Sequence, residues 1–391
     1  MPEAVIVSAV RTPIGTARKG TLADTSAQEL AVIAISEAAR RSGLPYDRFD
    51  DIILAESGWG GGDVARYAAV AAGMLSVPGQ AINRHCAGSL TAVANAAATI
   101  RAGMDSAVIA GGVHSTSTAP VMRYRVPGTV DQFEENWMSA SHPDSPEAPN
   151  RDMSISVGWN TAVEAGLTRE QLDAWAFRSH QRAVAAIDGG LFAEEIVPVK
   201  ALQKDGSLVD FAADEHPRRD TTLEKLAGLK VLHPEIEGFS ITAGNASGVN
   251  DAASALTLTS DELARSEGLT SLATVRAWAA LGVDPRRMGM AAVDIIPKLL
   301  ARAGVKQEDV AVWEINEAFA SVPVAACKLL GIDEEKVNPY GSGCSLGHPI
   351  AASGARMLTT LVHELRRRGG GIGVATMCAG GGQSGGVLIE V

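Results

Sequence analysis

A helix followed by a buried strand is predicted at two places in the first part of this chain of 391 residues. The same two helix–strand pairs are predicted again in its last part. The helices have apolar residues at helical spacing, and the strands are short apolar runs behind glycines. The matched pairs are 27–40 with 51–56 and 291–303 with 309–314, then 87–101 with 107–112 and 351–368 with 372–377. The separation between matched glycines, Gly43 to Gly304 and Gly111 to Gly380, is nearly constant. Two related α/β halves are therefore predicted, although two generic βα units would give a weaker version of this pattern.

Alternating helices and strands predict mainly parallel sheets covered by helices. The middle of the chain differs, because residues 119–160 are rich in Pro, Gly, Ser and Asn and predict an irregular excursion. Residues 169–187 return to a helical pattern. An insertion of this kind between two halves is expected to form a lid over a cleft.

The composition excludes several classes of protein. It is that of a soluble globular chain, with 46% hydrophobic and 20% charged residues, and the net charge of −11 disfavours general nucleic-acid or membrane-surface binding. No apolar run reaches the roughly 18 residues of a membrane span, and residues 4–8 enter a strand at once. The four cysteines lack disulfide-framework spacing, and no Cys/His cluster has zinc-ligand spacing, so a reducing cytoplasm and no metal are predicted.

Cys86 is the candidate nucleophile. It precedes a helical run, so unpaired backbone N–H groups and the helix dipole are expected to lower its pKa from about 8.5 and favour the thiolate. His348, in a His-Pro turn that also leads into a helix, would be the neutral imidazole that activates this thiol. Taken singly, a free cysteine is more often a small buried side chain and a lone histidine more often structural. The hypothesis therefore depends on the two residues lying together.

Three more residues complete the predicted site. Cys378 ends a strand and opens onto three glycines, where backbone N–H groups can approach a substrate oxygen. Gly380 would form half of an oxyanion hole with the amide of Cys86. The amide of Asn316 would hold a water or an enolate oxygen, although alone it would more often be a helix N-cap. Together these groups predict acyl chemistry in which a carbon–carbon bond is made or broken.

The remaining cysteines and histidines are weaker candidates. Cys327 lies in an apolar helical run and is predicted to be core, whereas Cys344 is close to His348 and receives no role. His85 adjoins the candidate nucleophile, but its side chain should point elsewhere, and His114 is likewise a weaker candidate than His348.

Six strings of residues, in order along nearly the whole chain, resemble the thiolase family of acetyl-CoA acetyltransferases and 3-ketoacyl-CoA thiolases. They are Val7 to Gly15, Asp220 to Leu226, Thr242 to Asp251, Asn316 to Ala320, Gly347 to Pro349 with Ser353 to Arg356, and Cys378 to Gly382. One such string would be a weak signal, whereas six in family order are specific.

The resemblance implies a thiolase-like α/β fold of two duplicated βαβαβαββ halves in a layered α-β-α-β-α arrangement, plus an inserted loop domain. We expect an N-terminal half at 1–118 and 248–270, a loop domain for coenzyme A binding at 119–247, and a C-terminal half at 271–391. A homodimer or homotetramer is also expected.

The resemblance also implies roles. Cys86 would be acylated, His348 would activate it, and Cys378 would move the proton at the α-carbon. Asn316, through a water, and His348 would stabilise the enolate oxygen, and the amides of Cys86 and Gly380 would hold the oxygen of the acyl-enzyme. A carbanion beside a thioester needs such preorganised donors for its charge.

Coenzyme A and acyl-CoA esters are the implied co-substrates, with no permanently bound cofactor. An acidic protein must bind their phosphates locally, and Arg218 with Arg219 would supply such a patch. Arg218 matches a family position near the nucleotide. Ala243 and Ser247 match positions along the pantetheine arm, where small residues admit a thin chain.

The chain also departs from the family pattern. Ala87-Gly88-Ser89 reverses two residues after Cys86, and Gly341 to Cys344 replaces the usual Gly-Gly-Ala. Val157 to Val163 stands where short-chain biosynthetic members carry Met-Gly-x-Thr-Ala-Glu. These changes favour a degradative acyltransferase of lipid metabolism that acts on longer or bulkier 3-ketoacyl-CoAs.

Three alternatives stay open on the sequence. The first is a short-chain biosynthetic acetyl-CoA acetyltransferase. The second is a decarboxylating ketoacyl synthase, which would prefer two histidines with one cysteine, so Cys378 argues against it. The third is an acyl-CoA or lipid binder without turnover, which the presence of Cys86, His348 and Cys378 disfavours.

Overall fold

A mixed α/β fold surrounds one continuous β-sheet in the computed structural model, which describes residues 1–58 and 62–391. The N-terminal part of this sheet contains, in spatial order, β1 (Ala4–Arg11), β10 (Asn250–Ser260), β5 (Ala107–His114), β3 (Asp51–Glu56) and β4 (Gln80–Ile82). The C-terminal part contains, in the same sense, β11 (Ala273–Gly282), β14 (Gln383–Glu390), β13 (Ile372–Ala379) and β12 (Val310–Ile315). The two parts therefore repeat one strand order.

The two parts of the sheet are joined at β1 and β11. These strands pair antiparallel over two positions only, Val5 with Thr274 and Ile6 with Ala273. The repeat is least complete at its last strand. Where the first half has β4, the second has only an isolated parallel bridge between Trp313 and Val337.

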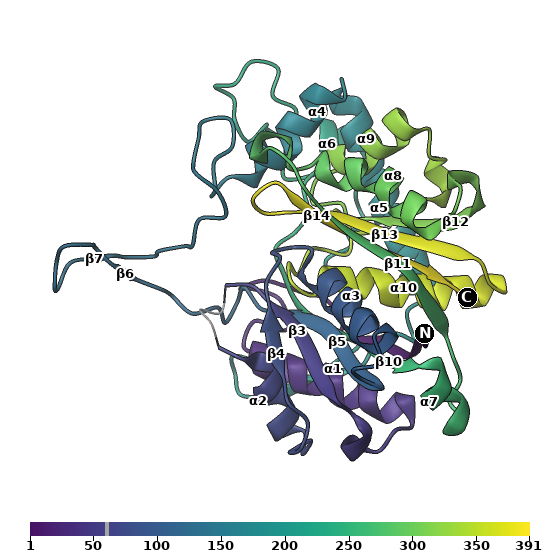
Figure 1. The fold of residues 1–391 in the computed structure, drawn as a ribbon. Helices are drawn as coiled ribbons and strands as arrows, with labels where there is room; N and C mark the ends of the chain where they lie inside the picture. The colour runs from purple at the N-terminus through teal and green to yellow at the C-terminus, as the bar shows by residue number, and fades with distance from the viewer. Residues whose placement is uncertain (59–61) are drawn as a thin grey trace.

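Helices cover the sheet in layers (Figure 1). On the outer face of the first half lie α1 (Ala27–Ser42) and α2 (Val64–Ala71), and on that of the second half lie α8 (Ala291–Ala303) and α9 (Ser321–Leu330). The helices α3 (Gly88–Arg101) and α10 (Ser353–Arg368) lie between the halves and contact strands of both. The core is correspondingly divided into three large apolar clusters, one per helical layer. The predicted five-layer arrangement is confirmed.

The expectation of mainly parallel sheets was wrong. Among the strands of the described residues, the parallel pairs are β3 with β4, β3 with β5, and β12 with β13. The centre of each half is antiparallel, because β10 pairs antiparallel with both β1 and β5. In the second half β14 follows β13 through a tight glycine turn and therefore runs back beside it.

The ends of the matched helices support the repeat. Gly43 ends α1 and Gly304 ends α8, and both have positive φ angles, 79° and 65°, which a residue without Cβ adopts at little cost. The second matched pair of glycines was wrong. Gly111 lies inside β5, whereas Gly380 lies in the turn beyond β13. When the first residues of these two matched strands are aligned, the two glycines do not coincide.

The insertion begins after β5 and ends at β10. Its first part contains the two-residue strands β6 (Tyr124–Arg125) and β7 (Phe133–Glu134), which form a hairpin that extends away from the body (Figure 1). Its regular elements then are a π-helical turn (Ser154–Trp159), α4 (Asn160–Glu164), α5 (Arg169–Asp188), β8 (Val199–Leu202), β9 (Leu208–Phe211) and α6 (Leu223–Ala227). The division of the chain at residues 118, 247 and 270 stays a prediction.

Short elements complete the described part of the chain: β2 (Gly15–Thr16), α7 (Asp261–Ser266) and 3-10 turns at Tyr46–Arg48, Pro285–Arg287, Gln307–Asp309 and Glu334–Lys336. None of the helices in residues 1–58 and 62–391 combines the length and the apolar character needed to cross a membrane.

Candidate active site

The two central helices bring distant segments together at their first turns. Ser89, in the first turn of α3, accepts a hydrogen bond from the backbone N–H of Ala355 in α10 at 3.0 Å. Gly354 makes this approach possible, because a Cβ at that position would lie 2.9 Å from the backbone nitrogen of Leu90. Since Cys86 precedes α3 and His348 precedes α10, the helix contact places both turns at one site.

Cys86 lies in a strand–turn–helix segment between β4 and α3. His85, just before it, has a left-handed φ of 45°, and its backbone N–H donates to Asn83 Oδ1 at 2.7 Å. The Cys86 side chain lines a cavity of about 250 Å³ together with His348, Cys378 and Gly380. The structure therefore brings four of the five predicted catalytic residues to one cavity.

The predicted direction of the Cys86 pKa was wrong. Burial raises the pKa of this thiol to about 11, while the backbone N–H groups of Cys86 and Gly380 act in the opposite direction. Loss of water around the sulfur therefore outweighs the helix terminus. The same two amides are those expected to form an oxyanion hole, and both reach the reacting sulfur.

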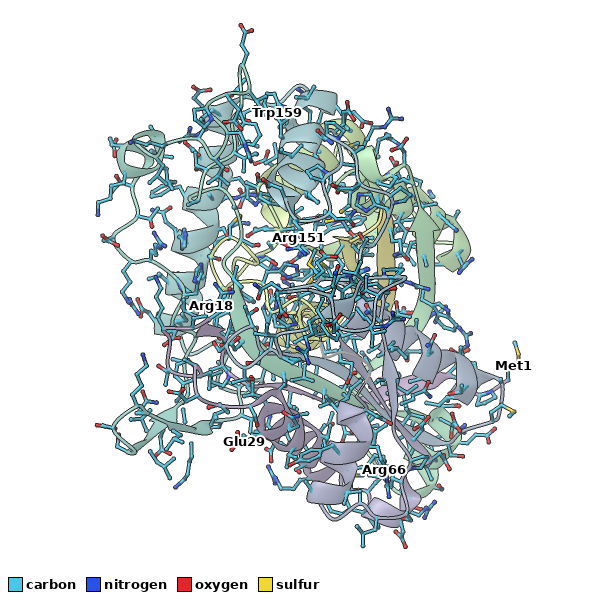
Figure 2. The ribbon with its side chains drawn as sticks, turned by 90° about the vertical axis from the view of Figure 1, so that its left-hand side faces the viewer. Met1, Arg18, Glu29, Arg66, Arg151 and Trp159 are labelled. Atoms are coloured by element: carbon cyan, nitrogen blue, oxygen red, sulfur yellow. The ribbon has the colours of Figure 1, made fainter. Side chains whose placement is uncertain are left out.

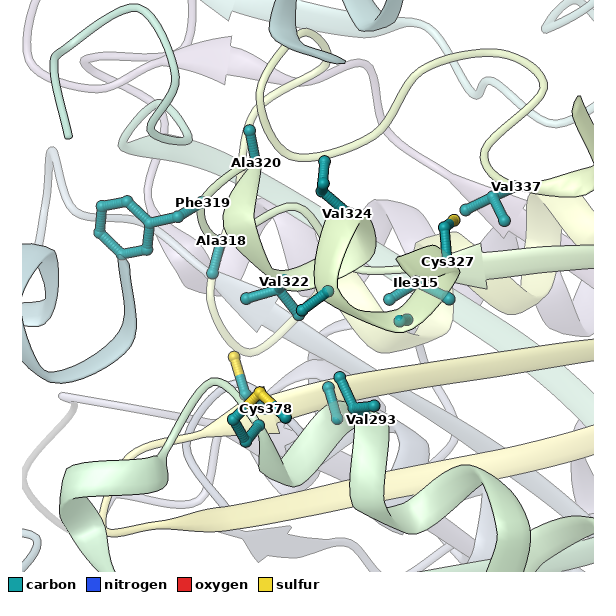
Figure 3. Packing of buried hydrophobic residues seen from close by; sticks show 14 of the residues in the cluster. Val293, Ile315, Ala318, Phe319, Ala320, Val322, Val324, Cys327, Val337 and Cys378 are labelled. Atoms are coloured by element: carbon teal, nitrogen blue, oxygen red, sulfur yellow. The ribbon is translucent and has the colours of Figure 1, made fainter. Parts of the chain in front are cut away.

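Cys378 is the last but one residue of β13 and is buried. Its pKa is raised by burial and then by the negative charge that Cys86 would carry, so the two sulfurs are close enough to interact. Figure 3 shows Cys378 at the end of its strand, beneath the segment that carries Ala318 and Phe319. These two residues line the same cavity.

His348 is held by one side chain from a distant strand and by one from the first turn of α10. Its backbone N–H donates to Asn250 Oδ1 at 3.0 Å, and its Nδ1 lies 2.6 Å from the hydroxyl of Ser353. Gly347 gives Asn250 room, because a Cβ there would lie 2.3 Å from the amide oxygen of Asn250. Burial lowers the pKa of His348 to about 3, so the imidazole is neutral. Its Nε2 has no hydrogen-bond partner within the described residues, which leaves it free to accept a proton.

Asn316 follows β12 and is fully buried. Its backbone N–H donates to Thr376 O at 3.0 Å, but neither polar atom of its side chain has a partner in the part of the chain that the structure describes. It does not belong to the residues that line the cavity. A buried amide without partners is what an external oxygen, such as that of a water or a substrate, would satisfy.

Glu317 anchors the turn that carries Asn316. Its carboxylate accepts hydrogen bonds from Trp175 Nε1, Ser179 Oγ, Asn338 Nδ2 and the backbone N–H of Cys344, at 2.7 to 3.1 Å. These donors come from α5 of the insertion and from the segment before His348. One buried carboxylate therefore connects the insertion to the candidate site.

A second cavity of about 420 Å³ adjoins the first. Arg218, Ala243 and Ser247 all line it, and their part in binding coenzyme A stays a prediction. Ser247 and Gly248 line both cavities, so they mark where the two meet. Arg219 does not belong to this lining, because its guanidinium pairs with Asp188 at 2.7 Å on the surface. The predicted pair of arginines thus separates into one cavity residue and one surface residue.

The remaining cysteines and histidines occupy distinct places. All four cysteines are free, and Cys327 lies in α9 near Ile315 and Val337, as predicted for a core residue (Figure 3). Cys344 is buried and lines the second cavity. The ring of His85 lies against Gly380, where a Cβ would approach it to 3.0 Å. His114 is buried at the end of β5, near enough to His348 to contribute to lowering its pKa.

Sequence reasoning missed two kinds of functional residue. Asn250 and Ser353 lie in strings that resemble the family. The contact of Asn250 with His348 needs the fold, whereas Ser353 follows His348 by five residues. The other kind is the apolar lining of the first cavity: Met153, Met288, Phe319 and Ile350. Apolar side chains of this kind have no sequence signal that separates a cavity wall from a core.

Comparisons with known proteins agree along the whole chain. Residues 4–262 match the family model described as thiolase, N-terminal domain, and residues 269–391 match thiolase, C-terminal domain. A β-ketoadipyl-CoA thiolase of Acinetobacter baylyi is 40% identical over 403 residues, covering 100% of both chains. An acetyl-CoA acetyltransferase of Pseudomonas aeruginosa is 39% identical over 397 residues, covering 98% of both.

A solved structure gives the same answer. The crystal structure of the Bacillus anthracis acetyl-CoA acetyltransferase has a TM-score of 0.90 to this fold and 38% sequence identity, and the match covers 100% of this chain and 99% of that one. Two family models that together span nearly the whole chain, and relatives at about 40% identity, lead to one conclusion. The chain belongs to the thiolase family of acyltransferases.

Proposed function

We propose that this chain transfers acyl groups between coenzyme A and 3-ketoacyl-CoA esters through an acyl-Cys86 intermediate, by thiolysis and by the reverse Claisen condensation. The observation that carries the proposal is the cavity shared by Cys86, Cys378, His348 and Gly380. It meets the cavity of Arg218 at Ser247 and Gly248. A thioester could therefore lie with its pantetheine arm across this junction.

In the first half of thiolysis, Cys86 passes its proton to Nε2 of His348 and its sulfur attacks the 3-keto carbon. The amides of Cys86 and Gly380 hold the oxygen of that carbon. The bond between carbons 2 and 3 breaks, and its electron pair enters the enolate of the acetyl thioester. Protonated His348, and Asn316 through a water, stabilise the enolate oxygen. Cys378 then gives its proton to carbon 2, and acetyl-CoA leaves.

In the second half, a coenzyme A thiol gives its proton to the Cys378 thiolate. Its sulfur attacks the acyl carbon on Cys86, whose oxygen again lies in the oxyanion hole. The Cys86 sulfur leaves and recovers its proton from His348, so every group returns to its starting state. The raised pKa of Cys378 supports its role, since a thiol that holds its proton tightly gives a thiolate that readily takes one back.

Turnover of 3-ketoacyl-CoA in the presence of free coenzyme A tests this function. The enolate absorbance of the substrate should fall with time, and mass spectrometry should find the acyl group on Cys86. Cys86→Ala should show no acyl group by mass. Cys378→Ser should still be acylated by an acyl-CoA but should stall at the carbon–carbon step. Labelling of another residue in Cys86→Ala, or near wild-type thiolysis by Cys378→Ser, would refute these roles.

The short-chain alternative, a biosynthetic acetyl-CoA acetyltransferase, is favoured by the name of the Pseudomonas aeruginosa relative. The departures at Val157 to Val163 support the degradative reading, in lipid breakdown. Initial rates of thiolysis across 3-ketoacyl chain lengths separate the two. A maximum at acetoacetyl-CoA would favour the biosynthetic enzyme.

We also propose a homo-oligomer, a dimer or a tetramer, in the cytoplasm. The exposed apolar side chains of the β6–β7 hairpin, among them Val130 and Phe133, support an assembled state. Light scattering coupled to size exclusion measures the mass directly, and the mass of a single chain would contradict the proposal.

A further inference from the structure

One wall of the cavity at Cys86 is apolar. Five of the lining residues, called the apolar wall here, are Met153, Val157, Met288, Phe319 and Ile350. They come from four separate segments, so the wall is a property of the fold rather than of one motif. Met153 directly precedes the π-helical turn, and Val157 lies within it. Figure 2 labels Arg151 and Trp159, two residues on either side of this pair. A helix of this rare type often marks a functional site.

The lining of this cavity, as far as the described residues define it, contains no lysine or arginine. The three arginines within two residues of the apolar wall have other partners. Arg286 pairs with Asp284 at 2.6 Å. Arg151 donates to the backbone oxygen of Asn136 at 3.2 Å. Arg287 pairs with Glu164 at 2.6 Å and with Asp294 at 3.0 Å. None of these three arginines belongs to the cavity lining.

The nearby imidazoles supply no positive charge to the resting site either. His348 lines the cavity, but burial keeps it neutral. His85 lies against Gly380 outside the lining, and burial followed by the charge of His142 lowers its pKa. An anionic end of a bound acyl group would therefore meet thioether, aliphatic and aromatic surface without a counter-ion.

We propose that the acyl group transferred to Cys86 ends in an apolar group, and that acyl groups ending in a carboxylate are excluded. The inference rests on the proposed function and adds its substrate class. Burying a carboxylate without a partner costs far more than burying a methyl group gains, so the discrimination is large. Relatives named for either class share about the same identity with this chain, so overall similarity does not decide between them.

The sharpest test compares two substrates of equal length. 3-Oxohexanoyl-CoA and 3-oxoadipyl-CoA both have six-carbon acyl chains and differ at the last carbon, which is a methyl group in one and a carboxylate in the other. We expect kcat/KM to favour 3-oxohexanoyl-CoA by at least about 100-fold, because the carboxylate loses its hydration without a counter-charge. A ratio below about tenfold, or one favouring 3-oxoadipyl-CoA, would overturn the inference.

Acetoacetyl-CoA distinguishes failure of the inference from failure of the proposed function. If acetoacetyl-CoA and 3-oxoadipyl-CoA are cleaved but 3-oxohexanoyl-CoA is not, the inference alone fails. If none of the three is cleaved, the proposed function fails and the inference falls with it. The mass of acylated Cys86 gives a second readout, with butyryl expected and succinyl absent.

A variant tests the place of the apolar wall. Met153→Lys puts a positive charge on a side chain of similar length, and Met153→Gln is the uncharged control. We expect Met153→Lys to reduce the preference for 3-oxohexanoyl-CoA by at least about tenfold through pairing with the carboxylate. Met153→Gln should leave most of the preference intact. An unchanged preference in Met153→Lys would overturn the placement of the acyl end at this wall.

Discussion

At the scale of single residues, Cys86 experiences two opposing influences. Backbone N–H groups at the start of α3 and at Gly380 favour the thiolate, but burial disfavours it more and raises its pKa to about 11. The free protein therefore holds a thiol, and the charge develops only when His348 takes the proton. This arrangement protects the nucleophile from unproductive reactions before a thioester fills the cavity.

The rate at which iodoacetamide alkylates Cys86 in the free protein should reflect this pKa. Because only the thiolate reacts, the rate should rise about tenfold per pH unit from pH 7 to 9.5 without a plateau. Peptide mass spectrometry assigns the modification to Cys86 rather than to another cysteine. A plateau beginning below pH 8.5 would mean that the helix terminus outweighs burial.

Arg218 and Arg219 form a matched pair for testing the second cavity. Arg218→Ala removes a cation from the cavity lining and should raise the apparent KM for CoA esters by about tenfold, with a smaller change in kcat. Arg219→Ala removes a neighbouring cation that pairs with Asp188 on the surface, so both constants should stay close to wild type. Equal effects of the two substitutions would move the nucleotide site elsewhere.

At the scale of elements, the contact between α3 and α10 assembles the site. Gly354→Ala should destabilise the fold by about 1–3 kcal/mol, since the new Cβ would meet Leu90 at 2.8 to 2.9 Å, partly at backbone that cannot move aside. Gly282→Ala is the control, because no atom lies within 4 Å of that Cβ. Urea unfolding measures both. Equal stability of the two variants would show that the helices separate readily.

Helices and strands could be predicted from sequence where the signal is local. The boundaries expected for α1, β3 and α8 agree with the structure within about two residues, because apolar spacing and terminal glycines are properties of neighbouring residues. Strand direction was not predictable in this way. The partners of β10 include β1 and β5, both far away in the chain, so its antiparallel pairing leaves no trace in its own residues.

The same distinction applies to the site. Cys86, His348, Cys378 and Gly380 could be selected because each has unusual neighbours, such as a His-Pro turn or three glycines. The pKa of Cys86 could not, because it depends on burial by segments that are distant in sequence. The contact of Asn250 with His348 likewise exists only after β10 lies beside the turn before α10, whereas Ser353 follows His348 by five residues.

At the scale of the whole molecule, neutral imidazoles couple stability to pH. Burial lowers the pKa of His348 to about 3 and those of His114, His180 and His216 to about 4. A lowered pKa in the folded state means that the unfolded chain binds protons first. These four imidazoles therefore leave the free energy of unfolding at its full value above pH 6.5. The free energy of unfolding decreases as the pH falls from 6.5 toward 4.

Several groups act in the opposite direction on acidification, because burial raises the pKa values of Glu56, Asp251 and Glu314. Burial raises the pKa of Glu314 to about 7, so acidification from pH 7 to 5 relieves the cost of its buried charge. Hydrogen bonds to Glu235 and Asp152 raise the pKa of His233, which therefore also favours the folded state at lower pH. The His233 side chain is 21% exposed, but its partner Glu235 is 66% exposed, so solvent screens this pair and its contribution is small.

The four imidazoles should outweigh these opposing groups. Each one costs about 2 kcal/mol between pH 6.5 and pH 5, at about 1.4 kcal/mol per pH unit. The free energy of unfolding in urea should consequently be lower at pH 5 than at pH 7, measured at one protein concentration so that any assembly is held constant. Equal or greater stability at pH 5 would mean that these imidazoles take up protons in the folded state, and the neutral His348 required for activating Cys86 would then lack support.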